Sequence, residues 1–318
     1  MWGGQLLFMA TIIQVLLPVL LIMALGYILR RTRVFSDQGI GELKFLVTKI
    51  ILPVAIFHAL STAEYSRQVW QQVAIMFVMM AVSCGIGYLL RPLMREPFRK
   101  YVPFMVSVYE GGMMAYPLYT HLCGMENLSH IALLDIAGLL FGFSVYMSLL
   151  TFTESGEKPS AGKLIRDAFK SPPFIAALLG ILMGISGGMR IFLTTAAGAV
   201  YQSAEQMITA PLSVIILLIV GYSIQLEKDM IAPCLKTVAL RAALQAVMVV
   251  GTLWAMHRFI GQDRLTDLAV IIYMSAPATF SMQSFVKDHR GGHYVSTANA
   301  IYCFVSIAVF AAASVLMG

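Results

Sequence analysis

The sequence predicts an all-α polytopic membrane protein, and two observations support this fold class. Hydrophobic residues make up 59% of the 318-residue chain and charged residues only 12%, whereas about a quarter of the residues in a soluble domain are charged. The mean hydropathy is +0.80, and the apolar residues gather in runs of about 20, the length of a helix that crosses a bilayer. A soluble protein is therefore not expected.

Ten apolar runs are long enough to be transmembrane helices. They cover residues 6–29, 40–60, 69–90, 102–122, 128–152, 172–189, 203–226, 233–259, 267–286 and 295–317. The first run ends in Arg30, Arg31 and Arg33 instead of a small-residue cleavage site, so we expect it to be a span and not a cleaved signal peptide. The sixth run is short, and a polar stretch at 201–206 obscures the start of the seventh.

The basic residues are concentrated on one side of this ten-span order. With the N-terminus outside, the inner connections hold most of them, including Arg30, Arg31, Arg95, Arg99, Lys100, Lys163, Lys170 and Arg241, and the outer connections hold Arg67, Arg190, Arg258 and Arg264. This asymmetry follows the positive-inside rule. We expect a multi-pass protein of the cell membrane with both termini outside the cytoplasm. The positive charge is then a topological signal and does not indicate nucleic-acid binding.

The longest connection divides the chain into two halves of five spans each. Residues 1–152 form the first predicted repeat, 153–171 the cytoplasmic linker and 172–318 the second repeat. Helix-breaking residues recur at nearly the same separation in sequence: Gly26 with Gly184, Pro53 with Pro211, and Pro117 with Pro277. Because each half has an odd number of spans, the repeats must run in opposite directions across the membrane. Such a 5+5 inverted repeat is typical of transporters.

Two proline-centred segments occupy matching places in the fourth and ninth spans. They read Tyr109-Glu-Gly-Gly-Met-Met-Ala-Tyr-Pro117 and Tyr273-Met-Ser-Ala-Pro277. Glycines followed by proline remove backbone hydrogen bonds at membrane depth, where freed groups are tolerated only against protein or a water-filled cavity. We therefore expect both helices to be broken and to bind a small molecule at the breaks, where half-helix N-termini favour anions.

These motifs, taken in order, resemble those of one transporter family. They are Leu17-Pro18 with Leu25-Gly26-Tyr27, Leu52-Pro53, Gly111-Gly112 to Pro117, Ala210-Pro211 with Gly221-Tyr222, and Ala276-Pro277. Over essentially its whole length the chain resembles the auxin efflux carrier family, which includes plant auxin exporters and bacterial malonate-type permeases. The resemblance implies that helices 4 and 9 cross at their prolines. It also implies transport of small organic anions, an elevator-like movement and a homodimer.

One departure from the family pattern concerns the fourth span. The family usually carries two asparagines there, whereas the matching positions hold Glu110 and Met113. An ionised carboxylate inside an apolar helix costs several kcal/mol unless it is paired or hydrated. We therefore expect Glu110 to load and release a proton during transport. The alternative is a structural carboxyl group that is permanently paired or that caps the half-helix beginning at Gly111.

Two further charged residues are candidates for coupling. Lys49 lies four residues before Pro53, and it either extends towards the cytoplasmic end or acts as an electrostatic partner for Glu110 or a substrate carboxylate. Asp135 either forms a proton relay with Glu110 or is a solvated or capping acid. The predicted substrate site contains Glu110, Gly111, Gly112, Met113, Pro117, Ser275, Pro277, Ser281 and Lys49, and the predicted coupling residues are Glu110, Asp135 and Lys49.

The expected function is that of a secondary transporter for a small organic carboxylate. The sequence has no nucleotide-binding loop and no HExxH motif, and neither ATP-driven transport nor an enzyme is predicted. No metal or cofactor is expected, and the expected partners are the substrate, membrane lipid and a second copy of the chain. A sodium-coupled symporter of the related bile-acid type and a ligand-binding membrane sensor remain as alternatives.

Overall fold

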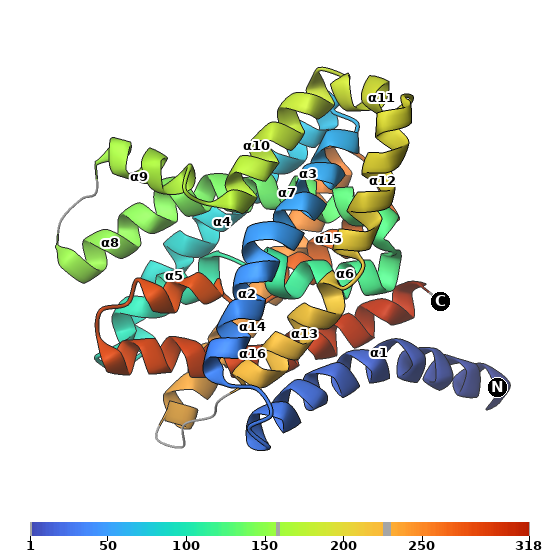
Figure 1. Cartoon of the computed structure of the whole chain (residues 1–318). Coiled ribbons are helices and arrows are strands. Elements are labelled where there is room, and N and C mark those ends of the chain that lie inside the picture. Colours follow the sequence, from blue (N-terminus) through green and yellow to red (C-terminus); the bar gives the residue numbers. More distant parts are fainter. Residues whose placement is uncertain (1, 157–159, 225–229, 318) are drawn as a thin grey trace.

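The computed structural model describes residues 2–156, 160–224 and 230–317, with the side chains of 2–16, 284, 289 and 315–317 left out. Within these ranges every regular element is a helix, and no strand occurs (Figure 1). The helices form one bundle, with α1 and α16 running along one side of it (Figure 1). The predicted all-α fold class is therefore confirmed.

The elements of the first half follow the expected spans closely. They are α1 (Trp2–Arg31), α2 (Asp37–Leu46), η1 (Val47–Ile51), α3 (Leu52–Thr62), α4 (Arg67–Leu90), η2 (Arg91–Leu93), η3 (Phe98–Tyr101), α5 (Val102–Ser107), η4 (Gly111–Ala115), α6 (Tyr116–Cys123), η5 (Met125–Asn127), α7 (Leu128–Phe141), η6 (Gly142–Tyr146) and α8 (Met147–Ser155). Elements α2, η1 and α3 form one continuous helical run, and so do η5, α7, η6 and α8.

The second half differs more from the expected boundaries. Its elements are α9 (Ala161–Ala168), α10 (Pro172–Ile185), α11 (Gly188–Leu193), α12 (Ala196–Thr209), α13 (Leu212–Ser223), α14 (Ile231–Phe259), α15 (Arg264–Met274), η8 (Phe280–Ser284) and α16 (His289–Met317). The expected start of the seventh span at 203 was too late. Thr195 caps α12 by accepting a hydrogen bond from the Gly198 N–H, so the polar stretch at 201–206 lies inside the helix.

Six helical runs in the described ranges are long and apolar enough to cross a membrane. They are Asp37–Thr62, Arg67–Leu93, Met125–Ser155, Ala196–Ser223, Ile231–Phe259 and Arg290–Ser314. Helices α9 and α10 would form a seventh span together, although they are bent by 81°. The chain is therefore a multi-pass membrane protein, and the full count of ten spans stays a prediction.

Glycines allow two helix pairs to pack at very short distance. A Cβ on Gly26 of α1 would overlap the backbone of Leu218 in α13, and one on Gly221 would overlap the backbone of Met23 in α1. Helices α10 and α3 pack in the same manner, because a Cβ on Gly184 would lie 2.7 Å from the Leu60 carbonyl oxygen. Small residues permit this backbone approach between membrane helices.

Candidate functional site

The helical path is interrupted at the first proline-centred segment. Helix α5 ends at Ser107, Val108 is extended with φ −124° and ψ 153°, and helical structure resumes at Gly111 as the wide turn η4. This turn continues directly into α6, where Pro117 lies in the first turn. Pro117 lacks the N–H that would bond to a carbonyl oxygen of η4, so the helical run loses one hydrogen bond here as well.

The second segment is interrupted in a similar way and contacts the first. Helix α15 ends at Met274 and η8 begins at Phe280. The Glu110 N–H donates to the Pro277 carbonyl oxygen at 2.8 Å, and the Ser306 hydroxyl of α16 donates to the Ser275 carbonyl oxygen at 2.6 Å. Backbone groups freed in one segment are thus satisfied partly by the other segment, as an apolar environment requires.

The Glu110 side chain joins the two segments a second time. Its Oε1 accepts a hydrogen bond from the Met113 N–H at 3.3 Å, and its Oε2 accepts one from the Phe280 N–H at 2.6 Å. The first contact makes Glu110 the N-cap of η4, the structural alternative considered for this residue. Backbone donors therefore surround the carboxylate, an arrangement that stabilises a negative charge.

Arg241 was assigned to an inner connection, and this assignment was wrong. It lies well inside α14 and is only 1% exposed. Its Nη2 donates to the carbonyl oxygens of Val108 at 3.1 Å and Ala276 at 2.6 Å, and its Nη1 donates to that of Met105. The guanidinium group therefore satisfies acceptors at both interruptions.

Gln245 supports the same region from one turn further along α14. Its Nε2 donates to the Val106 carbonyl oxygen at 2.6 Å, and its Oε1 accepts from the Tyr109 hydroxyl at 2.9 Å. Sequence reasoning missed both α14 residues. Their spacing of four residues, which places them on one helix face, and their position inside an apolar run were the available signals.

Asp135 of α7 accepts hydrogen bonds from two tyrosines on different helices. The Tyr116 hydroxyl donates at 2.8 Å and the Tyr273 hydroxyl at 2.5 Å. Glycines make room for this cluster: a Cβ on Gly111 would lie 2.7 Å from Asp135 Oδ2, and a Cβ on Gly138 would collide with the Tyr273 hydroxyl. Asp135 is therefore part of an interior network and does not cap its helix.

A cavity of about 690 Å³ lies beside the two interruptions. Its wall contains Lys49, Glu110, Gly111, Gly112, Met113, Asp135 and Ser281, together with Tyr146 and the α9–α10 segment around Lys170. Seven of the predicted residues are thus brought to one cavity. Most of the remaining wall is apolar, as is usual for small-molecule sites.

The other predicted residues lie behind this wall. Pro117 is buried in α6, and Ser275 uses its hydroxyl to donate to the Ile272 carbonyl oxygen at 2.9 Å. Pro277 contributes its carbonyl oxygen to the contact with Glu110. Lys49 has an exposed side chain, and within the described ranges no ion pair joins it to Glu110.

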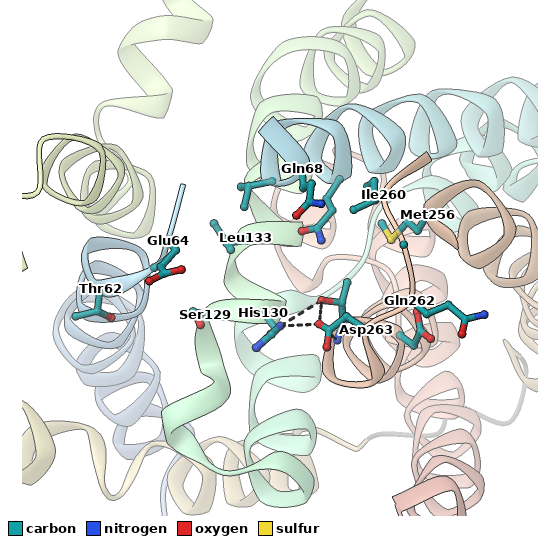
Figure 2. A pocket seen from close by; sticks show the side chains of 16 residues that line it. Thr62, Glu64, Gln68, Ser129, His130, Leu133, Met256, Ile260, Gln262 and Asp263 are labelled. Atoms are coloured by element: carbon teal, nitrogen blue, oxygen red, sulfur yellow. Dashed lines mark hydrogen bonds and ion pairs between the residues drawn. The ribbon is translucent and has the colours of Figure 1, made fainter. Parts of the chain in front are cut away.

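A second pocket of about 510 Å³ lies at the opposite ends of α3, α7 and α14. Figure 2 shows His130 of α7 beside Asp263, in the loop that precedes α15. His130 Nδ1 lies 3.4 Å from Asp263 Oδ2 and 3.2 Å from the Thr266 hydroxyl. Glu64, Gln68 and Gln262 complete a largely polar rim (Figure 2).

Asp263 also forms the N-cap of α15. Its Oδ2 accepts hydrogen bonds from the Thr266 N–H at 3.1 Å and the Thr266 hydroxyl at 2.5 Å. Partial burial alone would raise the pKa of Asp263, but these hydrogen bonds and the nearby His130 lower the pKa below its usual range. The carboxylate therefore stays ionised at neutral pH.

Comparison with known proteins agrees with this architecture. A family model described as "Membrane transport protein" matches residues 11–316. An uncharacterized transporter from Methanocaldococcus jannaschii is 24% identical over 183 residues, which are 55% of this chain and 58% of that protein. The similarity to this relative thus spans little more than half the length of either protein. Because the family model spans nearly the whole chain, the chain belongs to the membrane transport protein family, the family of auxin efflux carriers and related permeases.

Proposed function

We propose that the protein is a secondary transporter that moves a small organic anion across the cell membrane by elevator-like alternating access. The observation that carries this proposal is the joining of two interrupted helical segments at one cavity. The Glu110 N–H contacts the Pro277 carbonyl oxygen at 2.8 Å, and Glu110 also lines the cavity. Interrupted helices that meet at a binding cavity are characteristic of secondary transporters.

The proposed fold is a ten-span inverted repeat in which these segments are the crossing helices 4 and 9. Support comes from the two glycine-mediated helix pairs. In a 5+5 repeat, span 1 corresponds to span 6 and span 2 to span 7, so the pair α1 with α13 corresponds to the pair α10 with α3. Gly26 and Gly184 occupy matching places in the sequence. At each of them the absence of a Cβ allows the close approach of the two helices in its pair.

An anionic substrate is favoured by the donors around the cavity. The Met113 N–H at the start of a half-helix faces a carboxylate oxygen, and Lys49 and Lys170 line the same cavity. A half-helix N-terminus favours negative charge. We also propose that both termini lie outside the cytoplasm, that the protein is a homodimer and that transport is coupled to protons through Glu110.

Flux in proteoliposomes tests this function directly. The purified protein is reconstituted, and uptake of radiolabelled malonate and related small carboxylates is measured with and without proton and sodium gradients. We expect saturable uptake that responds to the proton gradient and is absent from empty liposomes. Uptake that requires sodium would favour the symporter alternative. Absence of flux for every carboxylate tested would overturn the proposed substrate class.

A further inference from the structure

The N–H groups that could bind an anion at the two interruptions already bind a side chain of the protein itself. Glu110 receives the Met113 N–H on one carboxylate oxygen and the Phe280 N–H on the other. A substrate carboxylate would need the same kind of donor. Because two carboxylates cannot share these donors without strong repulsion, the substrate anion and the ionised Glu110 side chain compete for one place.

No cationic side chain within the described ranges neutralises Glu110 by a direct ion pair. The charged groups on the surrounding elements are Lys49 on η1, Asp135 on α7, Asp167 and Lys170 at the α9–α10 bend, and Arg241 on α14. Asp135 is held by Tyr116 and Tyr273, and Arg241 is held by carbonyl oxygens. Tyrosine and cysteine side chains nearby ordinarily titrate above neutral pH. Glu110 is held by backbone N–H groups and not by an ion pair, so its charge can change without breaking one.

A second observation points to a missing ligand at the same cavity. Tyr146 of η6 lines the cavity and is only 2% exposed, and its hydroxyl has no hydrogen-bond partner in the described part of the chain. A buried polar group without a partner costs about 1–3 kcal/mol. The hydroxyl oxygen is itself buried, so a ligand oxygen can remove this penalty only after neighbouring side chains have moved aside.

We propose that the Glu110 carboxylate occupies the position that the carboxylate of the substrate takes when it binds. The substrate carboxylate displaces Glu110 from the Met113 and Phe280 N–H groups and also accepts a hydrogen bond from the Tyr146 hydroxyl. A proton that Glu110 takes up from the aqueous solution removes its charge and releases the two donors. One anion therefore binds together with one proton. This inference rests on the proposed function and specifies the substrate group that the site receives.

Equilibrium binding of a carboxylate across a pH range tests the displacement. Pyruvate is a suitable probe because it stays ionised from about pH 5.5 to about pH 8, so a change in affinity reports on the protein. Binding is measured on the purified full-length protein for the wild type, Glu110→Gln, Tyr146→Phe and Glu126→Gln. Glu126 is an exposed residue of η5 and provides the matched control for loss of one carboxylate.

Competition with Glu110 predicts that wild-type affinity falls by up to about tenfold for each unit rise in pH once Glu110 is ionised. Glu110→Gln should bind pyruvate at least about tenfold more tightly at the highest pH and lose the pH dependence. Tyr146→Phe should weaken binding by about fivefold to tenfold, the range expected for one lost hydrogen bond, without lowering the unfolding temperature. Glu126→Gln should match the wild type.

Three outcomes would separate the possibilities. Weaker binding by a folded Glu110→Gln variant would overturn displacement while leaving anion transport intact. Equal, pH-independent binding by all four proteins would also overturn displacement and leave anion transport intact. If no variant binds pyruvate, malonate or another small carboxylate at any pH, the proposed function fails, and the inference that rests on it fails too.

Discussion

The cavity at the interruptions and the pocket of Figure 2 hold their charged groups in opposite ways. In the cavity at the interruptions, Glu110 is bound by backbone N–H groups and Asp135 by tyrosine hydroxyls from two other helices. In the pocket of Figure 2, Asp263 pairs with His130 and caps its own helix. The charged groups of the first cavity and their partners come from distant parts of the chain. Those of the second pocket are partly exposed, and Asp263 makes its capping contact within its own helix.

This contrast indicates where loss of regular structure is compensated by specific contacts. Residues 108–110 and 275–279 give up helical hydrogen bonds, and Arg241 and Gln245 provide replacements. At the opposite pocket the helices end normally, so no such replacement is required. Substitutions at the interruptions should therefore have larger effects than comparable changes at the polar rim.

The largest expected effect is that of Arg241→Leu. Three carbonyl oxygens would lose their donor in a buried environment, and hydrogen bonds to charged groups contribute about 1.5–3 kcal/mol each. We expect a loss of about 3 kcal/mol or more in stability, measured by thermal unfolding in detergent. Arg190→Leu is the matched control, because its side chain is 82% exposed and lies 3.8 Å from Glu64; it should change stability by less than about 0.5 kcal/mol. Equal effects of the two substitutions would contradict the comparison.

Pro277→Ala should impair flux more than expression. With an N–H restored at this position, the helix can continue through residues 275–279, which would move the Pro277 carbonyl oxygen away from the Glu110 N–H. We expect at least about a tenfold loss of uptake, the consequence of about 1.4 kcal/mol lost at the site. Pro92→Ala, in an exposed turn, should retain uptake. Normal uptake by Pro277→Ala would argue against a functional interruption.

Two glycines that line the same cavity give a sharper comparison. A Cβ on Gly138 would collide with the Tyr273 hydroxyl, whereas a Cβ on Gly142 would have no atom within 4 Å. Gly138→Ala should destabilise the protein by about 1–3 kcal/mol through overpacking and reduce uptake. Gly142→Ala should leave uptake unchanged. Similar uptake by both variants would show that the Asp135 network tolerates displacement.

The smallest expected effect belongs to the opposite pocket. Asp263→Ala removes the N-cap of α15 and should cost about 0.5–2 kcal/mol, while Asp263→Asn should cost less because asparagine also caps. The pKa of Asp263 is lowered in the folded protein, so its stabilising effect is present above the unfolded pKa of about 3.9 and is lost as the pH falls through the folded value. Unfolding temperatures of wild type and Asp263→Ala should therefore converge in acid. A constant difference would contradict this assignment.

The sequence predicted the fold class and most helix positions because apolar runs and helix-breaking residues are local signals. It also brought attention to Glu110, since a carboxyl in an apolar run is visible without a structure. The partner of that carboxyl was not visible: the Phe280 N–H is far away in sequence. The same holds for Arg241, which reads as a basic residue near a helix start until its contacts with Val108 and Ala276 are known.

Boundaries were hardest to predict where polar residues continue inside a helix. The stretch at 201–206 suggested a loop, yet it lies within α12, with Glu205 buried and accepting a hydrogen bond from the Thr209 hydroxyl at 3.1 Å. Linker residues were also underestimated, because 153–171 contains α9. In both cases a tertiary contact or a cap, and not composition, decides where the helix begins.

The bend between α9 and α10 has a consequence for the cavity at the interruptions. The connection between these helices places Asp167, Lys170 and Pro172 in the wall of that cavity. The connection therefore does more than join the helices on either side of it, because a change in its length would also reshape the cavity wall.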